Sequence, residues 1–396
     1  MESGEFRVGH PHPIICSSEA SNHNSQLSTL NSQLKKDLYM SRYIIDKKGL
    51  DENIELIKNM ANGEVIGVVK GNGYGFGIKE FTLALKEHGI KTFAVTEVSD
   101  IPVLKEILEN EDILVMRSTC VESEARIIAE NGCIATIGSL AAAEMMNKIG
   151  GELGVKVKCH LKIDTGMGRY GFLPSEINDA IKCYSLPNLE FIGAYTHFSS
   201  AFRNRELTKA QLVLFKDTME QIKAEVGEVG TIHAANSPAL LNVEGVCLGA
   251  VRIGSAFTGR VITKSKTKLK RLGVLEAEVV DVKTVPAGYS IGYNGTYTTK
   301  KETKIAIVPI GHYDGFGIGK EKELYDFRYV LSVFKAFLKK KQMYVRINGE
   351  MHYVIGGIGL SHTAVDITGT DIKPGDMATV DISPLMVNPR IERVYK

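Results

Sequence analysis

The chain has 396 residues, of which 44% are hydrophobic and 24% are charged, and its formal net charge is +2. This length suits two domains better than one, and the composition is that of a globular protein and not of a disordered chain. Because the charges nearly balance, there is no electrostatic reason to expect nucleic acid or an acidic membrane as a partner. No apolar run approaches the ~20 residues that span a bilayer, so we expect no direct membrane contact by this chain.

The six cysteines are scattered, without a C-x-x-C pair and without the spacing of a metal site. This pattern favours reduced thiols in the cytoplasm over a disulfide framework, and it predicts no metal centre. Residues 1–38 are rich in Ser, Asn, His and Pro and lack the basic-then-apolar order of a signal peptide. We expect them to form a flexible leader or linker outside the fold.

From residue 64 onward, a short β-branched apolar run followed by an amphipathic helical stretch recurs along the chain. Strands are predicted at residues 64–70, 92–96, 112–116, 133–138, 156–164, 191–198, 230–237 and 250–257. Eight such repeats predict a (β/α)8 TIM barrel, which we assign to residues 39–268. An open doubly wound sheet uses the same alternation and is the alternative architecture.

The pattern changes after the basic stretch at residues 264–271. Residues 269–396 contain short runs of alternating hydrophobicity separated by Gly, Asn and Asp, which predict a mainly antiparallel β domain. The stretch YVLSVFKAFLKKK at residues 329–341 predicts a helix there. The expected fold is therefore an α/β TIM barrel followed by a C-terminal β domain.

Charged residues gather where the predicted barrel strands end, which is where such barrels hold their chemistry. The first strand ends at Lys70 in a glycine-rich stretch, and a lysine at the end of an apolar strand is costly unless it has a partner or a covalent bond. The fifth strand ends near Lys162, Asp164 and Arg169, and the sixth near His197. Taken singly, these residues also have structural explanations: a rim lysine for Lys70, a surface ion-pair cluster for the three charges after the fifth strand, and a core histidine for His197.

The seventh predicted strand ends in residues that are typical of a helix start, and the eighth contains a glycine near its end. Asn236, Ser237 and Pro238 predict a capped helix start, and Arg252 and Gly254 follow on the eighth strand. Most capped helix starts bind nothing, but a phosphate site built by the loops after strands seven and eight recurs in these barrels. Because charged residues and glycines have no packing reason to gather at one rim, their joint placement predicts a binding site.

The chain resembles the alanine racemases in motifs that follow the family's order. These are VVKGNGYGFG, LKIDTGMGRYGF, YTHFSS, HAANSPA, RIGSAFTG, SIGYNGTYTTKKETKIAIVPIGHYDGF and PRIERVY. The resemblance covers residues 42–396. It implies a fold-type III enzyme that uses pyridoxal 5'-phosphate, acts on a small amino acid and forms a head-to-tail homodimer with shared active sites.

The resemblance also implies a two-base mechanism. Lys70 would hold the cofactor and serve as one base, and Tyr293 from the partner subunit would serve as the other. Two bases are needed because racemisation removes a proton from one face of the α-carbon and delivers one to the other face. Arg169 would hold the substrate carboxylate, and Lys162 matches a position that is carbamylated in the family and would orient Arg169.

The remaining matched residues imply the cofactor site. Arg252 would face the pyridine nitrogen and keep it unprotonated, which discourages side reactions such as transamination. His197 would lie against the ring. The phosphate would be held by Tyr74, Ser237, Gly254 and Ser255.

The chain departs from the family's pattern around the substrate. His312 stands in place of an entryway tyrosine, and Leu360 and Ser361 replace a Met-Asp pair. The backbone amide of Leu360 can still bind a carboxylate. Near the C-terminus a pocket tyrosine is missing, and either Met386 or Asn388 takes its place. We favour Asn388, because a polar amide in the enlarged space gives a reason for the change.

These departures resemble the serine-racemising branch associated with vancomycin resistance, whose members join a racemase domain to an N-terminal membrane domain. The resemblance implies racemisation of serine and alanine for cell-wall precursors, by a cytoplasmic domain of a membrane-anchored parent. One alternative is an ordinary alanine racemase with little serine activity. A basic-amino-acid decarboxylase would be longer and carry a Gly-Gly-Gly loop, and a non-catalytic pyridoxal-phosphate carrier would lack residues 270–396.

Overall fold

The computed structural model describes residues 40–263, 265–319, 331 and 342–396. The predicted leader at residues 1–38 lies outside this part of the chain. So does the helix predicted at residues 329–341, apart from Leu331. None of the helices within the described residues is both long and apolar enough to cross a membrane.

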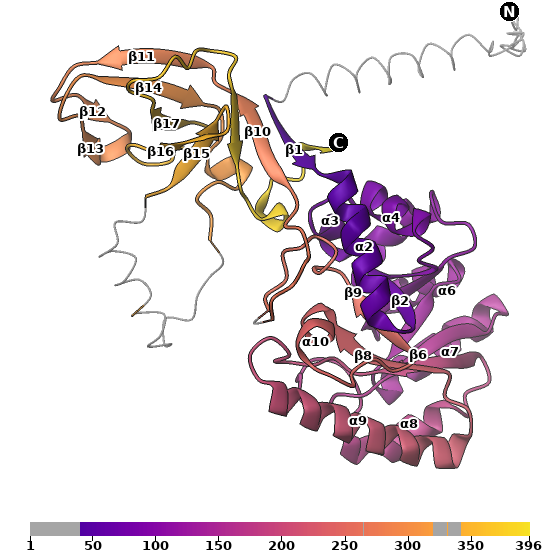
Figure 1. The fold of residues 1–396 in the computed structure, drawn as a ribbon. Helices are drawn as coiled ribbons and strands as arrows, with labels where there is room; N and C mark the ends of the chain where they lie inside the picture. The colour runs from indigo at the N-terminus through magenta and orange to yellow at the C-terminus, as the bar shows by residue number, and fades with distance from the viewer. Residues whose placement is uncertain (1–39, 264, 320–330, 332–341) are drawn as a thin grey trace, which may run out of the picture. The chain divides into compact units, whose positions relative to one another are not determined.

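Parallel strands, from β2 to β9 along the chain, form a barrel (Figure 1). The barrel is closed because the first of these strands, β2, pairs with the last, β9. The barrel strands are β2 (Glu64–Val68), β3 (Thr92–Val95), β4 (Asp112–Ser118), β5 (Ile134–Ile137), β6 (Val157–Lys162), β7 (Leu189–Tyr195), β8 (Thr231–Asn236) and β9 (Ala250–Ile253). All eight predicted strands, and the predicted barrel, are confirmed. Their nearly continuous apolar runs are those of parallel strands that are buried on both faces.

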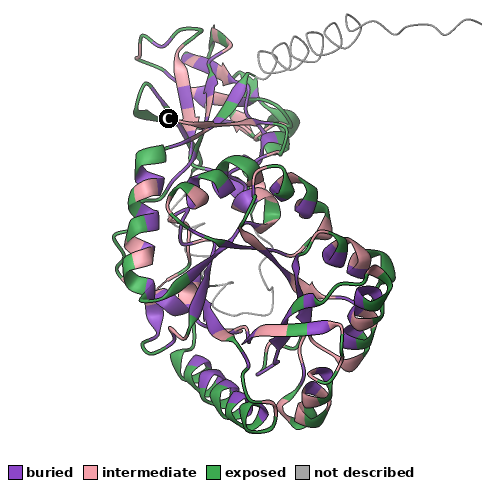
Figure 2. Ribbon diagram, turned by 90° about the vertical axis from the view of Figure 1, so that its right-hand side faces the viewer, coloured by how far each residue is buried: buried purple, intermediate pink, exposed green. Residues whose placement is uncertain are grey.

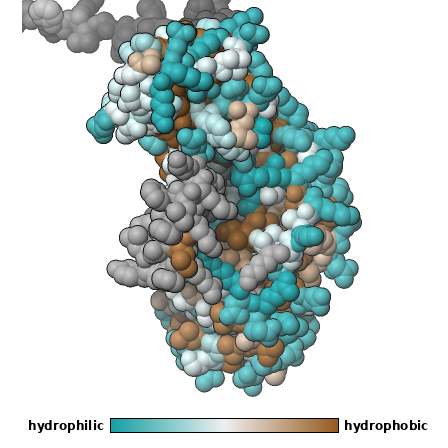
Figure 3. All heavy atoms as spheres, turned by 60° about the vertical axis from the view of Figure 1, so that its left-hand side comes forward, coloured by the Kyte–Doolittle hydropathy of each residue, from teal (hydrophilic) through white to brown (hydrophobic). Residues whose placement is uncertain are grey.

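Helices surround the barrel with their apolar faces toward the strands and their exposed residues outward (Figure 2). The longer ones are α2 (Lys47–Ala61), α4 (Ile78–Glu87), α6 (Glu122–Glu130), α7 (Leu140–Leu153), α8 (Ile177–Cys183) and α9 (Arg205–Val226). Side chains of Asp46, Ser139 and Asn204 cap the first turns of α2, α7 and α9 by accepting backbone N–H groups. On the face drawn in Figure 3, hydrophilic residues cover most of the described surface.

The C-terminal β domain contains a six-stranded sheet in the order β16-β15-β18-β10-β1-β19, a three-stranded sheet in the order β11-β14-β17, and the hairpin β12-β13. The strands are β10 (Val274–Glu278), β11 (Asp281–Val285), β12 (Ser290–Ile291), β13 (Tyr297–Thr298), β14 (Thr303–Val308), β15 (Tyr344–Ile347), β16 (Glu350–Tyr353), β17 (Thr363–Asp366), β18 (Met377–Val380) and β19 (Glu392–Tyr395). The pairing is mainly antiparallel, as predicted. Asn348 and Gly349 join β15 to β16 with φ of 52° and 87°, the left-handed conformation that a tight hairpin turn favours.

The strand β1 (Ser41–Ile45) belongs to the C-terminal sheet, although the sequence prediction assigns residues 39–268 to the barrel. It pairs antiparallel with β10 and parallel with β19. Its buried and exposed residues alternate, with Tyr43 and Ile45 fully buried, which is the pattern of a sheet with one solvated face. A barrel strand is apolar on both faces. The alternating pattern of β1 therefore explains why it belongs to the C-terminal sheet and not to the barrel.

Candidate active site

Lys70 lies two residues beyond the end of β2 and begins a left-handed turn, α3 (Lys70–Tyr74). The φ angles of Gly71, Asn72, Gly73 and Tyr74 are 63°, 54°, 63° and 54°. This conformation costs a residue with a side chain about 1–2 kcal/mol, whereas glycine adopts it freely. The strain therefore falls on Asn72 and Tyr74. Strained backbone of this kind persists only where surrounding structure holds it, and it concentrates at functional sites.

A cavity of about 170 Å³ lies at the carboxyl ends of the barrel strands. All the residues predicted to bind the cofactor line this cavity: Lys70, Tyr74, His197, Ser237, Arg252, Gly254 and Ser255. Val68, Met116, Asn236 and Pro238 complete the described lining. The structure thus brings together residues that lie far apart in the sequence.

One wall of the barrel cavity is built from the start of α10 (Ser237–Asn242) and the end of β9. Asn236 caps this helix by accepting the N–H of Ala239 at 3.1 Å, so the predicted capped start is confirmed. The Ser237 hydroxyl accepts the backbone N–H groups of Gly254 and Ala256, each at 3.2 Å. Hydroxyl and amide groups therefore converge at this wall, which is the chemistry of an anion site.

Gly254 meets the ring of Tyr74 at this wall. A Cβ atom at position 254 would lie 2.2 Å from the tyrosine ring, so a side chain there would have to displace Tyr74. Burial raises the pKa of Tyr74 to about 12, so its hydroxyl stays protonated near neutral pH. The cavity therefore combines a glycine that cannot be replaced without movement and a phenol that can donate a hydrogen bond.

Arg252 is buried on β9, and its guanidinium donates hydrogen bonds to neighbouring groups that hold it in place. Its Nη1 donates to Nδ1 of His233 at 2.8 Å, and its Nη2 donates to the Thr196 carbonyl at 2.7 Å and to Nδ1 of His197 at 3.3 Å. Because a guanidinium only donates, both histidines accept at Nδ1. Burial and then the charge of Arg252 hold the pKa of His197 and His233 well below their usual range. Burial lowers the pKa of Arg252 to about 10, which leaves it charged near neutrality.

Lys162, the last residue of β6, has only 3% of its surface exposed. Its Nζ lies 4.5 Å from the centroid of the Tyr195 ring, whose other cationic neighbour is Arg252 at 4.7 Å. Burial, followed by the charges of Arg252 and Arg169, lowers the pKa of Lys162 to about 7. A substantial fraction of this amine is therefore uncharged at neutral pH.

The loop after β6 presents Arg169 next to these cations. The Asp164 carboxylate accepts the backbone N–H groups of Gly166, Met167 and Arg169 at 2.9, 2.7 and 3.0 Å. Burial opposes these bonds, but their balance lowers the pKa of Asp164. Arg169 is exposed and does not line the cavity, yet its charge, after burial, helps to lower the pKa of Lys70.

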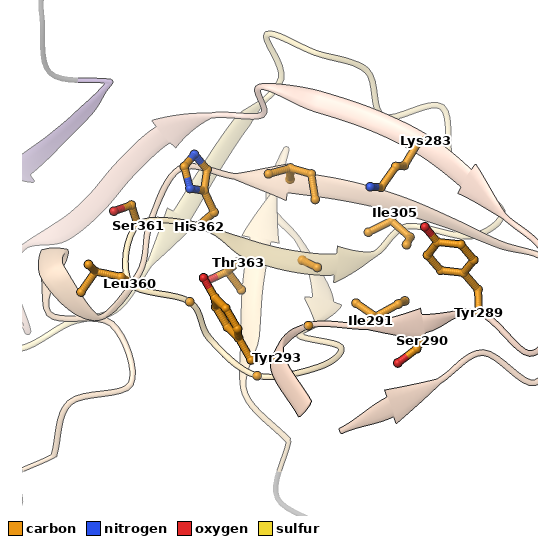
Figure 4. Close-up of a pocket in the computed structure, with 15 residues that line it drawn as sticks. Lys283, Tyr289, Ser290, Ile291, Tyr293, Ile305, Leu360, Ser361, His362 and Thr363 are labelled. Carbon is orange, nitrogen blue, oxygen red and sulfur yellow. The ribbon is translucent and has the colours of Figure 1, made fainter. Parts of the chain in front are cut away.

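A second cavity, of about 690 Å³, lies in the β domain (Figure 4). Leu360 and Ser361 lie at one end of it, Tyr289 and Lys283 lie at the other, and Tyr293 lies between them. Tyr293 follows the end of β12, at the tip of the β12–β13 hairpin, and is 78% exposed. The two predicted bases therefore line different cavities of the same chain.

His312 does not line the β-domain cavity, but its backbone is bonded to Gly359, which does. Its backbone N–H donates to the Gly359 carbonyl at 3.0 Å, and the next residue, Tyr313, donates to the Leu360 carbonyl at 2.8 Å. Nδ1 of His312 donates to the Phe316 carbonyl at 2.9 Å, which leaves Nε2 as the acceptor of the ring. The structure thus connects His312 with Leu360.

Asn388 and Met386 are not among the described residues that line either cavity. The Asn388 Nδ2 donates to the Tyr313 carbonyl at 3.3 Å, and its Oδ1 accepts the Arg390 backbone N–H at 3.0 Å. Both ends of the amide are therefore bonded to main chain. Lys162, Arg169 and His312 are also absent from the described linings of both cavities.

The sequence analysis missed several residues of the barrel site. Met116 lines the cavity, and His233 and His160 form a hydrogen-bonded pair behind Arg252, with 2.9 Å between their ring nitrogens. A polar side chain inside an apolar barrel strand was the available signal, since neither histidine has a packing reason to be there.

A closed (β/α)8 barrel with a cavity at the strand ends, lined by a lysine and by hydroxyl and amide groups, and followed by a mainly antiparallel β domain, defines a class of barrel proteins whose chemistry lies at the strand ends. Two family patterns match the chain. The pattern described as "Alanine racemase, N-terminal domain" matches residues 45–261, and "Alanine racemase, C-terminal domain" matches residues 273–388.

Relatives and solved structures agree with this match. The alanine racemase of Clostridium novyi is 32% identical over 345 residues, which cover 84% of this chain and 83% of that protein. That of Methanococcus maripaludis is 31% identical, with 85% and 87% covered. The structure of the Clostridium difficile 630 alanine racemase has a TM-score of 0.80 at 26% identity, with 91% and 96% covered.

The chain therefore belongs to the alanine racemase family, a family of pyridoxal-phosphate-dependent racemases. Because both domains match, neither the decarboxylase nor the lone-barrel carrier is favoured.

Proposed function

We propose that this protein interconverts the L- and D-forms of alanine and serine, with Lys70 of one subunit and Tyr293 of a second subunit as the two bases. One observation carries this proposal: Lys70 lines the barrel cavity, whereas Tyr293 lines a separate and exposed wall of the β domain. A head-to-tail homodimer would bring the two walls together and complete two equal sites.

The barrel cavity fits pyridoxal 5'-phosphate. The start of α10, the Ser237 hydroxyl and the backbone near Gly254 suit a phosphate group. Arg252 suits the pyridine nitrogen, because a charged donor leaves that nitrogen an acceptor. Tyr74 closes the phosphate side. When bound, the cofactor supplies an electron-withdrawing ring that makes the substrate's α-hydrogen acidic.

Lys70 suits the roles of cofactor anchor and base. Burial, with the charges of Arg169 and Arg252, lowers its pKa and so increases the fraction of free amine at neutral pH. The same positive charges would stabilise a phenolate entering from a second subunit, which supports Tyr293 as the base on the opposite face. Arg169, whose backbone N–H is held by the Asp164 carboxylate, would bind the substrate carboxylate.

We also propose that Lys162 is carbamylated. Its uncharged amine can attack carbon dioxide, forming a nitrogen–carbon bond and releasing a proton, and a pKa of about 7 makes that form available. The resulting anion would lie near Arg252 and Arg169, which offsets the surplus of positive charge and would orient Arg169.

Serine activity is the finer part of the proposal. With the Asn388 amide bonded to main chain, the Ser361 hydroxyl is the better candidate to meet a substrate hydroxyl, since it lines the cavity with Tyr293. The cytoplasm is the proposed location, and cell-wall precursors and vancomycin resistance are the proposed context. That location and context rest on the sequence resemblance alone.

Kinetics with L-alanine and L-serine, measured side by side by chiral chromatography of the products, test the proposal. A hydroxyl buried without a partner costs about 1–3 kcal/mol, or roughly ten- to a hundredfold in specificity. We expect kcat/KM values for the two substrates to lie within about tenfold of each other. A kcat/KM for L-serine more than about a hundredfold below that for L-alanine would mean that the protein is an ordinary alanine racemase with little serine activity.

A further inference from the structure

The strand β19 reaches from the β domain to the left-handed turn that follows Lys70. The Arg393 Nε donates to the Gly75 carbonyl at 3.0 Å, and the Tyr395 hydroxyl donates to the Phe76 carbonyl at 2.9 Å. Gly75 and Phe76 are the two residues that follow the turn directly. Two side chains of one strand therefore hold two successive carbonyl groups of the segment that carries Lys70.

The Arg393 guanidinium donates hydrogen bonds to main-chain carbonyls of both segments, the one that follows the turn and the loop before β19. Besides Gly75, it donates to the carbonyls of Val387 at 3.1 Å, Asn388 at 2.8 Å and Ile391. Burial lowers the pKa of Arg393. The planar guanidinium of arginine has several N–H donors in fixed directions and can bond to all these carbonyls, whereas the single ammonium of a lysine cannot.

The backbones of the two segments also approach each other closely. A Cβ atom at Gly75 would lie 2.2 Å from the Pro384 carbonyl oxygen, which leaves no room for a side chain. Gly75 also has φ of 85°, a conformation that residues with a side chain rarely adopt. A Cβ at Gly71 would lie 3.7 Å from the Leu385 side chain. The loop before β19 is thus packed directly on the turn.

The turn needs such support because its conformation is unfavourable at Asn72 and Tyr74. Inside the segment, the Asn72 side chain accepts the Ile78 N–H at 3.0 Å, and the Gly75 N–H donates to the Gly71 carbonyl at 3.0 Å. These bonds fix the shape of the turn, and the bonds from β19 fix its position. Both kinds of restraint act on Lys70 at one end of the turn and Tyr74 at the other.

We propose that Arg393 and Tyr395 are positioning residues, which hold the left-handed turn so that Lys70 and Tyr74 face the barrel cavity together. This inference rests on the proposed cofactor roles of Lys70 and Tyr74. Neither β19 residue lines the cavity, so they act only through the turn. Misplacing a reacting group by about 1 Å can cost on the order of a hundredfold in rate, so a small movement of the turn is enough to matter.

Tyr395→Phe and Arg393→Lys test the proposal in the dimeric holoenzyme. Tyr353→Phe and Arg346→Lys are matched controls. Tyr353 lies on β16 and Arg346 on β15 of the same sheet, and the Arg346 Nη1 donates to the Gly349 carbonyl at 3.2 Å within their own hairpin. The measurements are the affinity for added pyridoxal phosphate, the visible absorbance of the lysine-bound cofactor and its pH titration, kcat and KM for L-alanine, and the thermal midpoint.

We expect both β19 variants to lose roughly tenfold in cofactor affinity and in kcat, with KM changed less than about twofold, and we expect the pH titration of the absorbance to shift. Arg393→Ala should regain part of its cofactor affinity when ethylguanidinium is added. A lower thermal midpoint with unchanged cofactor affinity, kcat and titration would mean a structural role only and would overturn the proposal.

The parent protein separates failure of this inference from failure of the proposed function. Borohydride reduction and peptide mapping of the parent come first. If Lys70 is not labelled, the proposed function itself is wrong and the positioning role goes with it. If Lys70 is labelled and both β19 variants behave like their controls, only the positioning role is wrong.

Discussion

Gly254 lies so close to Tyr74 that a Cβ atom at position 254 would be 2.2 Å from the tyrosine ring. Gly254→Ala should therefore displace Tyr74 from the wall assigned to phosphate. Overpacking of this kind costs about 1–3 kcal/mol, so we expect a loss of roughly ten- to a hundredfold in affinity for pyridoxal phosphate, measured by absorbance titration. Gly319→Ala is the control, since a Cβ there meets no atom of the described residues within 4 Å. Equal affinities in the two variants would contradict the assignment of this wall.

Lys70 should be the only lysine that borohydride attaches to the cofactor. The reason is that Lys70 lines the same cavity as the anion-binding wall and has a lowered pKa. Mass spectrometry of proteolytic peptides should place the label in the segment VVKGNGYGFG. A label on Lys162, the other lysine with a lowered pKa near this site, would show that the two roles have been exchanged.

Tyr293→Phe should lower turnover by about a hundredfold or more in at least one direction, which is the scale of a lost general base. Because the second base is proposed to come from the other subunit, mixing this variant with an inactive Lys70→Ala chain should restore activity in heterodimers that hold one intact site. Rates of both directions and of the mixture are the measurement. Tyr344→Phe is the control. Full activity of Tyr293→Phe would reject the role, and failure of the mixture to recover would reject the shared site.

Carbon dioxide should activate the enzyme through Lys162. Because burial and neighbouring cations lower the pKa of Lys162 to about 7, the uncharged amine becomes more abundant as the pH rises through 7. The gain in activity on adding bicarbonate to degassed enzyme should therefore be larger at pH 8 than at pH 6. Lys162→Ala should show no such response. A parent enzyme indifferent to bicarbonate, with no added mass of carbon dioxide on Lys162, would refute carbamylation.

Ser361→Ala should affect the two substrates differently. Loss of one hydrogen bond to the serine hydroxyl is worth about 0.5–1.5 kcal/mol, so kcat/KM for L-serine should fall by up to roughly tenfold, while that for L-alanine changes less than about twofold. Asn388→Ala is the comparison, because the Asn388 amide is bonded to main chain and its loss should affect both substrates alike. If Asn388→Ala alone alters the ratio, the serine-binding role returns to Asn388.

The barrel could be predicted strand by strand because each buried strand, such as TFAV in β3, is apolar on both faces. The segment that forms β1 was not predicted as a strand and was included in the barrel domain, since its partners β10 and β19 lie far away in sequence and no local pattern identifies them. Motif matching found Arg252 but not the His233 ring that fixes its direction. For Asn388, residue type suggested a pocket role, whereas its bond to Tyr313 depends on how two loops distant in sequence meet.

The pairing of β1 with β19 has a consequence for how the protein is made. Arg42 is opposite Glu392, so the first described strand has no parallel neighbour until the ribosome has synthesised residues 392–395. Contacts between residues so far apart in sequence form slowly, and the edge of β1 stays open to other chains in the meantime. The barrel strands lie between residues 64 and 253, so the barrel can assemble before the sheet that carries Arg393 and Tyr395 is complete. Newly made protein should therefore acquire its cofactor site later than its compact fold.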